Sequence, residues 1–193
     1  MIEREIKATV ADPAAVTARL VAAGAIRDFL GLMSDHRFDR NGTLSAKEEV
    51  LRVRRFSAVG SPDRIVLGWK GPVAVDRGAK LREEIEVDAT GDVDGLLRAI
   101  GFHEVHAIDR FVEIYRLGEA IIRLEWYPRM DVLIEVEGSE PAIAAAVSVL
   151  GIPRSQFSAE ALTVFVARYL MAGGRPALSL AELGDGEPSW SAR

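Results

Sequence analysis

Residues 80–88 read Lys80-Leu81-Arg82-Glu83-Glu84-Ile85-Glu86-Val87-Asp88, a run of strand length in which charged and apolar side chains alternate. Successive side chains of a strand point to opposite faces of a sheet. One face of this run therefore carries Lys80, Arg82, Glu84, Glu86 and Asp88, and the other carries Leu81, Ile85 and Val87. The run predicts a strand with one apolar face and one face that mixes bases with acids.

The same parity recurs in five other segments that we predict as strands. Their charged faces carry Glu3, Glu5 and Lys7; Arg52 and Arg54; Lys70; Arg123 and Glu125; and Glu135 and Glu137. For any one strand, a solvated face of an antiparallel sheet is the simpler interpretation. A solvated face usually also holds Thr, Ser and Gln, however, whereas these faces hold mainly Arg and Glu. We therefore predict a sheet that curves around a charged interior, with helices packed outside.

Segments of period two alternate with segments of helical period along the chain. We predict strands at about 2–10, 32–39, 48–57, 64–70, 80–88, 105–117, 119–127 and 131–138. We predict helices at about 13–23, 92–100, 140–150 and 159–171. After residue 171 the composition turns to Gly, Pro, Ser and acidic residues, so we expect 172–193 to be a poorly ordered tail. The pattern predicts an α+β fold.

Length and composition exclude several classes of protein. The 193 residues suffice for one domain with a sizeable core. The 24 basic and 29 acidic residues give a net charge of −5, which argues against binding to duplex nucleic acid. The absence of cysteine excludes disulfides, thiolate zinc sites and cysteine nucleophiles. No run approaches the roughly 18 to 20 apolar residues of a membrane span, and the acidic start is unlike a signal peptide, so we expect a cytoplasmic protein.

A charged interior must pair its charges or bind something. Guanidinium groups match phosphate oxygens in a bidentate way, and clustered glutamates suit hard cations such as Mg²⁺ or Mn²⁺. The bases predicted to line the interior are Lys7, Arg52, Arg54, Lys70, Arg82, Arg110 and Arg123. The acids are Glu3, Glu5, Glu84, Glu86, Glu125, Glu135 and Glu137. Bases and acids in equal number fit a polyphosphate that carries divalent metal.

Six segments, in order, resemble motifs of the CYTH family, the triphosphate tunnel metalloenzymes. The segments are Glu3-Arg4-Glu5-Ile6-Lys7, Asp35-His36-Arg37-Phe38-Asp39, Leu51-Arg52-Val53-Arg54, Leu67-Gly68-Trp69-Lys70-Gly71-Pro72, Arg82-Glu83-Glu84-Ile85-Glu86 and Leu133-Ile134-Glu135-Val136-Glu137-Gly138. The resemblance covers about residues 1–170. It implies an eight-stranded antiparallel β tunnel (a barrel), open at both ends with helices outside, formed by a domain of residues 1–171.

The resemblance also implies roles for individual residues. Mg²⁺ or Mn²⁺ would bind to Glu3, Glu5, Glu125, Glu135 and Glu137. Glu84 and Glu86 would orient the bases or bind a second metal ion. The triphosphate would bind to Lys7, Arg52, Arg54, Lys70, Arg82, Arg110 and Arg123. Catalysis would depend on Glu5, Lys7, Arg54 and Lys70.

Three positions depart from the family pattern. Ile108 stands where the family has a lysine in a Lys-x-Arg pair, so one phosphate ligand is missing. Glu125 stands in place of the usual aspartate, one methylene longer, and Arg37 stands in place of the usual tyrosine. These departures bear on substrate and rate rather than on the scaffold.

Three functions are compatible with this interior. The leading hypothesis is metal-dependent hydrolysis of a triphosphate, because it requires no adenine site. The alternative enzyme is an adenylyl cyclase, in which the ribose 3′-hydroxyl attacks the α-phosphorus and pyrophosphate leaves. A non-catalytic module that binds polyphosphate or nucleotide is the third. In each case the partner is a small-molecule triphosphate, with no nucleic acid duplex and no membrane, and a homodimer is one candidate assembly.

Overall fold

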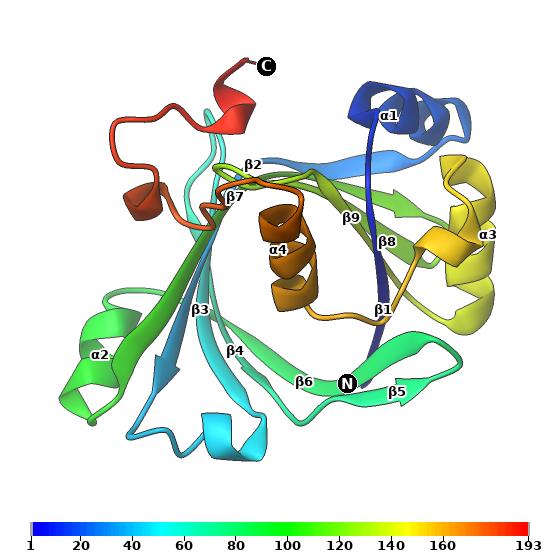
Figure 1. Cartoon of the computed structure of the whole chain (residues 1–193). Coiled ribbons are helices and arrows are strands. Elements are labelled where there is room, and N and C mark those ends of the chain that lie inside the picture. The colour runs from blue at the N-terminus through cyan, green and yellow to red at the C-terminus, as the bar shows by residue number, and fades with distance from the viewer. Residues whose placement is uncertain (1, 193) are drawn as a thin grey trace.

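Eight antiparallel strands close into a barrel in the computed structural model, which describes residues 2–192 (Figure 1). The ring order is β1-β9-β8-β7-β2-β3-β4-β6, and β6 returns to β1. The strands are β1 (Ile2–Thr9), β2 (Ile26–Asp39), β3 (Val50–Ser57), β4 (Arg64–Lys70), β6 (Ala79–Ala89), β7 (His103–Leu117), β8 (Ala120–Trp126) and β9 (Leu133–Glu137). The predicted α+β class and eight-stranded barrel are confirmed.

The barrel closes on β1, which belongs to two ladders. Its first half pairs with β6, from Ile2 opposite Glu83 to Glu5 opposite Lys80. Its second half pairs with β9, beginning with Glu5 opposite Glu137. Glu5 is therefore the residue at which the two ladders overlap, and its side chain lies at the seam of the barrel.

Helices α1 (Pro13–Ala22) and α3 (Glu140–Leu150) cover the outer face of β1, β8 and β9 (Figure 1). The α1 helix begins where the Asp12 carboxylate accepts a hydrogen bond from the Ala15 amide at 3.0 Å. The core beneath both helices is apolar and includes Ile6, Leu20, Ile122, Ile134 and Leu150. Helix α2 (Val93–Ala99) packs on a smaller cluster with Phe38 and Val53. The apolar strand faces thus point outward and the charged faces inward.

Helix α4 (Leu162–Met171) lies over one end of the barrel (Figure 1). The chain leading to it is fixed to β1, since Lys7 and Ser158 exchange two backbone hydrogen bonds of 2.9 Å. Phe165 of α4 packs against Ile108 of β7 and Leu133 of β9. Residues near this helix also line the barrel interior, so this end is partly covered.

The segment predicted as a tail contacts the barrel through its backbone. The Ala177 amide donates to the Arg129 carbonyl at 2.8 Å, and the Asp109 amide donates to the Leu178 carbonyl at 2.8 Å. Short 3₁₀ helices lie at Ser45–Lys47, Arg154–Gln156, Leu180–Glu182 and Ser189–Ala192. The division of the chain at residue 171 remains a prediction.

Two features of the sheet differ from the predicted elements. Strand β2 begins at Ile26, six residues before the predicted start at 32, because residues 26–31 pair with β7 from Ile26 opposite Arg116 onward. Strand β5 (Ala74–Asp76) was not predicted; its three exposed residues pair only with β6. Among the described residues, no helix is both long and apolar enough to span a membrane.

Adjacent residues of α1 provide a test of this packing. Leu20 is fully buried, whereas Val21 is mostly exposed. Leu20→Ala is expected to lower the free energy of unfolding by about 2–5 kcal/mol, because it removes buried methyl groups and leaves a cavity. Val21→Ala is expected to change it by less than about 0.5 kcal/mol. Urea denaturation of both variants measures the difference, and equal effects would contradict the described orientation of α1.

Candidate functional site

The barrel encloses a cavity of about 410 Å³ whose lining is rich in basic side chains. All the bases predicted to hold phosphate line this cavity: Lys7, Arg52, Arg54, Lys70, Arg82, Arg110 and Arg123. A larger cavity of about 690 Å³ lies outside the barrel beside α3, but residues such as Ile143 and Val147 make its lining mainly apolar. The interior cavity is therefore the candidate site, because it gathers the charged groups.

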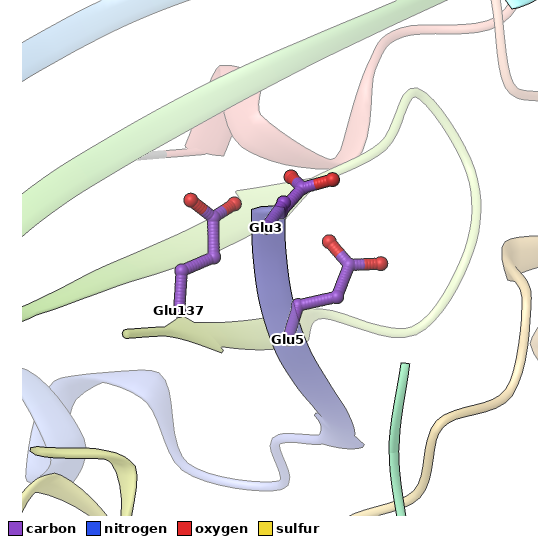
Figure 2. A group of neighbouring side chains, drawn as sticks. All are labelled: Glu3, Glu5 and Glu137. Carbon is purple, nitrogen blue, oxygen red and sulfur yellow. The ribbon is translucent and has the colours of Figure 1, made fainter. Parts of the chain in front are cut away.

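Three carboxylates meet at the seam of the barrel. Glu3 and Glu5 project from β1 and Glu137 from the neighbouring β9, and Figure 2 shows that they lie side by side. One oxygen from each lies within 4.8 Å of the others. Burial, with help from the carboxylates of Glu135 and Glu3, raises the pKa of Glu137 well above its usual range despite nearby Arg123. Crowded carboxylates of this kind are the donor set that a hard divalent cation prefers.

Asp35 of β2 joins the bases on the opposite side of the interior. Its two carboxylate oxygens accept hydrogen bonds from Arg54 Nε and Nη2, at 2.6 and 2.9 Å. Arg110 also donates to Asp35, and Arg52 lies 3.5 Å from it. Although burial opposes the shift, the three guanidinium groups hold the pKa of Asp35 well below its usual range. Asp35 thus keeps three positive charges side by side.

Lys7 connects the acidic seam to the bases. Its Nζ lies 2.8 Å from Glu5 Oε1 and also contacts Glu135. These carboxylates raise the pKa of Lys7 although burial alone would lower it. Lys7 and Arg123 in turn hold the pKa of Glu135 well below its usual range against the effect of burial. Lys7 and Glu135 are therefore both charged at neutral pH.

The other predicted glutamates contact bases rather than joining the cluster of Glu3, Glu5 and Glu137. Arg52 Nη2 lies 3.1 Å from Glu84 and 2.7 Å from Glu86. Lys70 lies 2.8 Å from Glu3 and 3.0 Å from Glu84, so it connects both groups.

Glu125 is fully buried beside Tyr127 and Arg110. It accepts a hydrogen bond from the Tyr127 hydroxyl at 2.6 Å and one from Arg110 at 3.1 Å. Of the predicted glutamates, only Glu5 and Glu135 line the cavity itself, within the described part of the chain.

Several cavity residues were not assigned from the sequence: Asp35, Arg37, Lys80, His106 and Tyr127. The parity of residues 80–88 already placed Lys80 on the charged face, and its Nζ contacts Glu5 in the structure. Asp35 and Arg37 lie in the segment 35–39 that carried the resemblance. No pattern in the sequence pointed to Tyr127, because its role depends on the pairing of β7 with β8.

Several guanidinium groups keep an unused donor. The Nε atoms of Arg52, Arg110 and Arg123 are buried and have no hydrogen-bond partner. A buried N–H without an acceptor is unfavourable, and an oxyanion in the cavity would accept from it. The site can therefore bind a polyanion next to a carboxylate cluster that can hold metal.

Comparison with solved structures supports this architecture. A candidate adenylate cyclase from Vibrio parahaemolyticus is similar with a TM-score of 0.70 and 18% identity, over 86% of this chain and 98% of that chain. The PH1819 protein of Pyrococcus horikoshii is similar with a TM-score of 0.66 and 24% identity, over 87% and 99%. HpAC1 from Hippeastrum has a TM-score of 0.61 and 19% identity, over 92% and 99%. The chain shares the fold of these proteins, a closed eight-stranded antiparallel barrel. No family model and no curated protein matches the sequence.

Asp35 provides a test of the charge network in the tunnel. Asp35→Ala leaves the surrounding guanidinium groups uncompensated and is expected to lower the free energy of unfolding at pH 7 by about 3–5 kcal/mol. Asp28 lies on the same strand as Asp35 and forms an exposed ion pair with Arg116 of β7. Asp28→Ala is expected to lower the free energy of unfolding by no more than about 1 kcal/mol. Chemical denaturation of both variants measures the effects.

The pH dependence of this effect has a defined sign. The folded-state pKa of Asp35 lies below its unfolded value of about 3.9. The contribution of ionised Asp35 to the free energy of unfolding is therefore complete above the unfolded-state pKa. It is lost as the pH falls toward the folded-state pKa. The difference between wild type and Asp35→Ala is expected to shrink only below about pH 4. A difference that disappears between pH 7 and pH 5 would contradict the depressed pKa.

Proposed function

We propose that the protein is a metal-dependent triphosphatase that hydrolyses inorganic tripolyphosphate, a nucleoside triphosphate or thiamine triphosphate inside the tunnel. The observation that carries this proposal is the position of Glu5. Its carboxylate belongs to the cluster with Glu3 and Glu137, contacts Lys7 and Lys80, and lines the cavity. A phosphate bound by the cavity bases would thus lie beside the carboxylates proposed to hold the metal.

Acidic and basic residues of the barrel interior would have different roles in the reaction. Glu3, Glu5 and Glu137 would hold Mg²⁺ or Mn²⁺, which when bound draws negative charge from phosphate oxygens. Lys7, Arg54 and Arg123 line the cavity and would neutralise the nonbridging oxygens of the transferred phosphoryl group. Water would attack the terminal phosphorus as the bond to the bridging oxygen breaks and the remaining phosphates leave.

Glu135 is suited to orient the attacking water. It lines the cavity, and its lowered pKa keeps it ionised, so it can accept a hydrogen bond from the attacking water while remaining a weak base. Lys7 and Arg123 contact this carboxylate and would fix its position. As the oxygen of this water bonds to phosphorus and the bridging P–O bond breaks, the water proton would pass to the phosphate that leaves or to solvent.

Among the similar structures, HpAC1 supports hydrolysis over cyclisation. HpAC1 is described as a candidate adenylyl cyclase with a dominant triphosphatase activity, so the two activities have been associated with this fold. Cyclisation needs the α-phosphorus at the reacting position and a place for ribose and base. Hydrolysis needs neither, and the charged lining described above accounts for it.

Product analysis tests the proposal directly. Purified protein is incubated with inorganic tripolyphosphate or ATP and Mg²⁺ or Mn²⁺, and orthophosphate, pyrophosphate and cyclic AMP are measured. We expect orthophosphate release that falls by at least about 100-fold in Glu5→Gln, because the variant loses the negative charge of a proposed metal ligand, which also pairs with Lys7. Glu140→Gln, which alters an exposed ion pair with Arg77, is the matched control and is expected to retain full activity.

Each other product identifies a different function. Cyclic AMP with pyrophosphate from ATP would replace the triphosphatase with an adenylyl cyclase. Binding of tripolyphosphate without any product would indicate a binding module and contradict an enzyme. An equal loss of activity in Glu140→Gln would show that the effect of Glu5→Gln is not specific to the seam.

Metal binding is tested separately by thermal unfolding. Mn²⁺ at 100 times its dissociation constant should stabilise the wild type by about 2.7 kcal/mol, seen as a higher Tm. Glu137→Gln should lose most of this shift while keeping the metal-free Tm, since the amide resembles the neutral carboxyl that burial favours. An unchanged Mn²⁺ shift in Glu137→Gln would remove this residue from the proposed metal site.

A further inference from the structure

Arg37 is a cavity residue whose side chain has no ion-pair partner among residues 2–192. It lies on β2 two residues after Asp35, so both side chains are on the inner face, and it lines the cavity. In the sheet it is directly opposite Arg52 of β3 on one side and His106 of β7 on the other. His106 lines the same cavity, and burial together with the charge of Arg37 lowers its pKa.

Within residues 2–192, the Arg37 side chain makes no hydrogen bond or ion pair, and its Nε is buried without a partner. The other lysines and arginines of the cavity contact carboxylates or, for Arg82, backbone carbonyls. Burial and the neighbouring Arg110 and Arg52 lower the pKa of Arg37 although Asp35 opposes this. The ligand-free protein therefore stabilises Arg37 poorly.

We infer that Arg37 is a substrate-binding residue which, together with Arg52, binds one phosphate group of the substrate that is not the group held at the carboxylate cluster. Like charges directly opposite each other on a sheet are unfavourable unless something lies between them. Both Arg37 and Arg52 keep a buried Nε without an acceptor. An oxyanion between the two guanidinium groups would accept from both and remove their repulsion.

This assignment deepens the triphosphate function proposed above and rests on it. Arg37 contacts none of Glu3, Glu5 and Glu137, so the phosphate that it binds is distinct from the one beside the metal. Such a contact would select for chain length: a substrate with three phosphates reaches both places, whereas pyrophosphate reaches fewer of the bases. Arg37 would then govern affinity and specificity rather than the chemical step.

Arg37→Met tests the inference, because methionine keeps an apolar stem and removes the charge. Binding of inorganic tripolyphosphate and of pyrophosphate is measured by titration calorimetry without metal, where no turnover is needed. We expect tripolyphosphate to bind about 10- to 100-fold more weakly, the loss typical of a charged hydrogen bond, and pyrophosphate affinity to change less than threefold. In the activity assay, KM for tripolyphosphate rises with kcat within about threefold. The Tm of the ligand-free variant is expected to stay equal or rise.

The matched control is Arg55→Met. Arg55 follows Arg54 on β3, so it points to the outer face, where it pairs with Asp94. It is expected to lower Tm without altering tripolyphosphate affinity, the opposite pattern to Arg37→Met. Arg37→Lys should recover part of the affinity.

Two results would overturn the inference. The first is an unchanged dissociation constant for tripolyphosphate in Arg37→Met, and the second is a lower Tm of the ligand-free variant with equal losses for both ligands. Because binding is measured without turnover, weaker binding in Arg37→Met by a protein that hydrolyses nothing would retain the inference and reject the triphosphatase. Hydrolysis in which Arg37→Met changes neither KM nor kcat would retain the triphosphatase and reject the inference.

Discussion

The inner face of a closed barrel must balance its own charge, because closure removes that face from bulk water and an unpaired buried charge is strongly unfavourable. The seam on β1 brings Glu5 opposite both Lys80 and Glu137, so acids and bases are interleaved at the point where the sheet closes. On the far wall, Asp35 balances several guanidinium groups at once. The positions of the charged side chains follow from this requirement, and the helices cover the apolar face that is left outside.

A buried network of paired charges adds little to the stability of the fold, but it places basic side chains where a polyanion can bind. Replacing a buried ion-pair network by apolar residues is often neutral or stabilising, so folding alone does not require one. Here the balance is also incomplete, since the Nε atoms of Arg52, Arg110 and Arg123 have no acceptor. An interior whose bases are already held by carboxylates and still offers unused donors can exchange some of these protein contacts for contacts with phosphate oxygens.

Much of the fold and of the bases could be predicted because both follow from parity. Alternation placed Arg52 and Arg54 on one face of a strand, and a face so rich in Arg and Glu indicated the interior. The relations between strands could not be predicted in this way. Both β6 and β9 lie beside β1, so the cluster depends on register: Glu137 of β9 lies opposite Glu5, whereas the β6 residue opposite Glu5 is Lys80 rather than a glutamate. The central role of Asp35 depends on three partners from two other strands, and a short exposed strand such as β5 has no periodicity to detect.

Ile108 connects the cover of the tunnel with the placement of its charges. The resemblance implies a lysine at this position, whereas Ile108 is fully buried, packs with Phe165 of α4 and lines the cavity directly opposite Asp35. Strand β7 thus provides an apolar support for α4 at the end where the cavity is partly covered. The neighbouring strand β2 carries a positive charge at Arg37. This residue lies directly opposite His106 and two residues after Asp35, which is opposite Ile108. Compared with the pattern that the resemblance implies, β7 lacks a base at Ile108, where it packs against α4. The neighbouring strand β2 carries a base at Arg37 instead. The cavity therefore stays basic although apolar packing partly covers one of its ends.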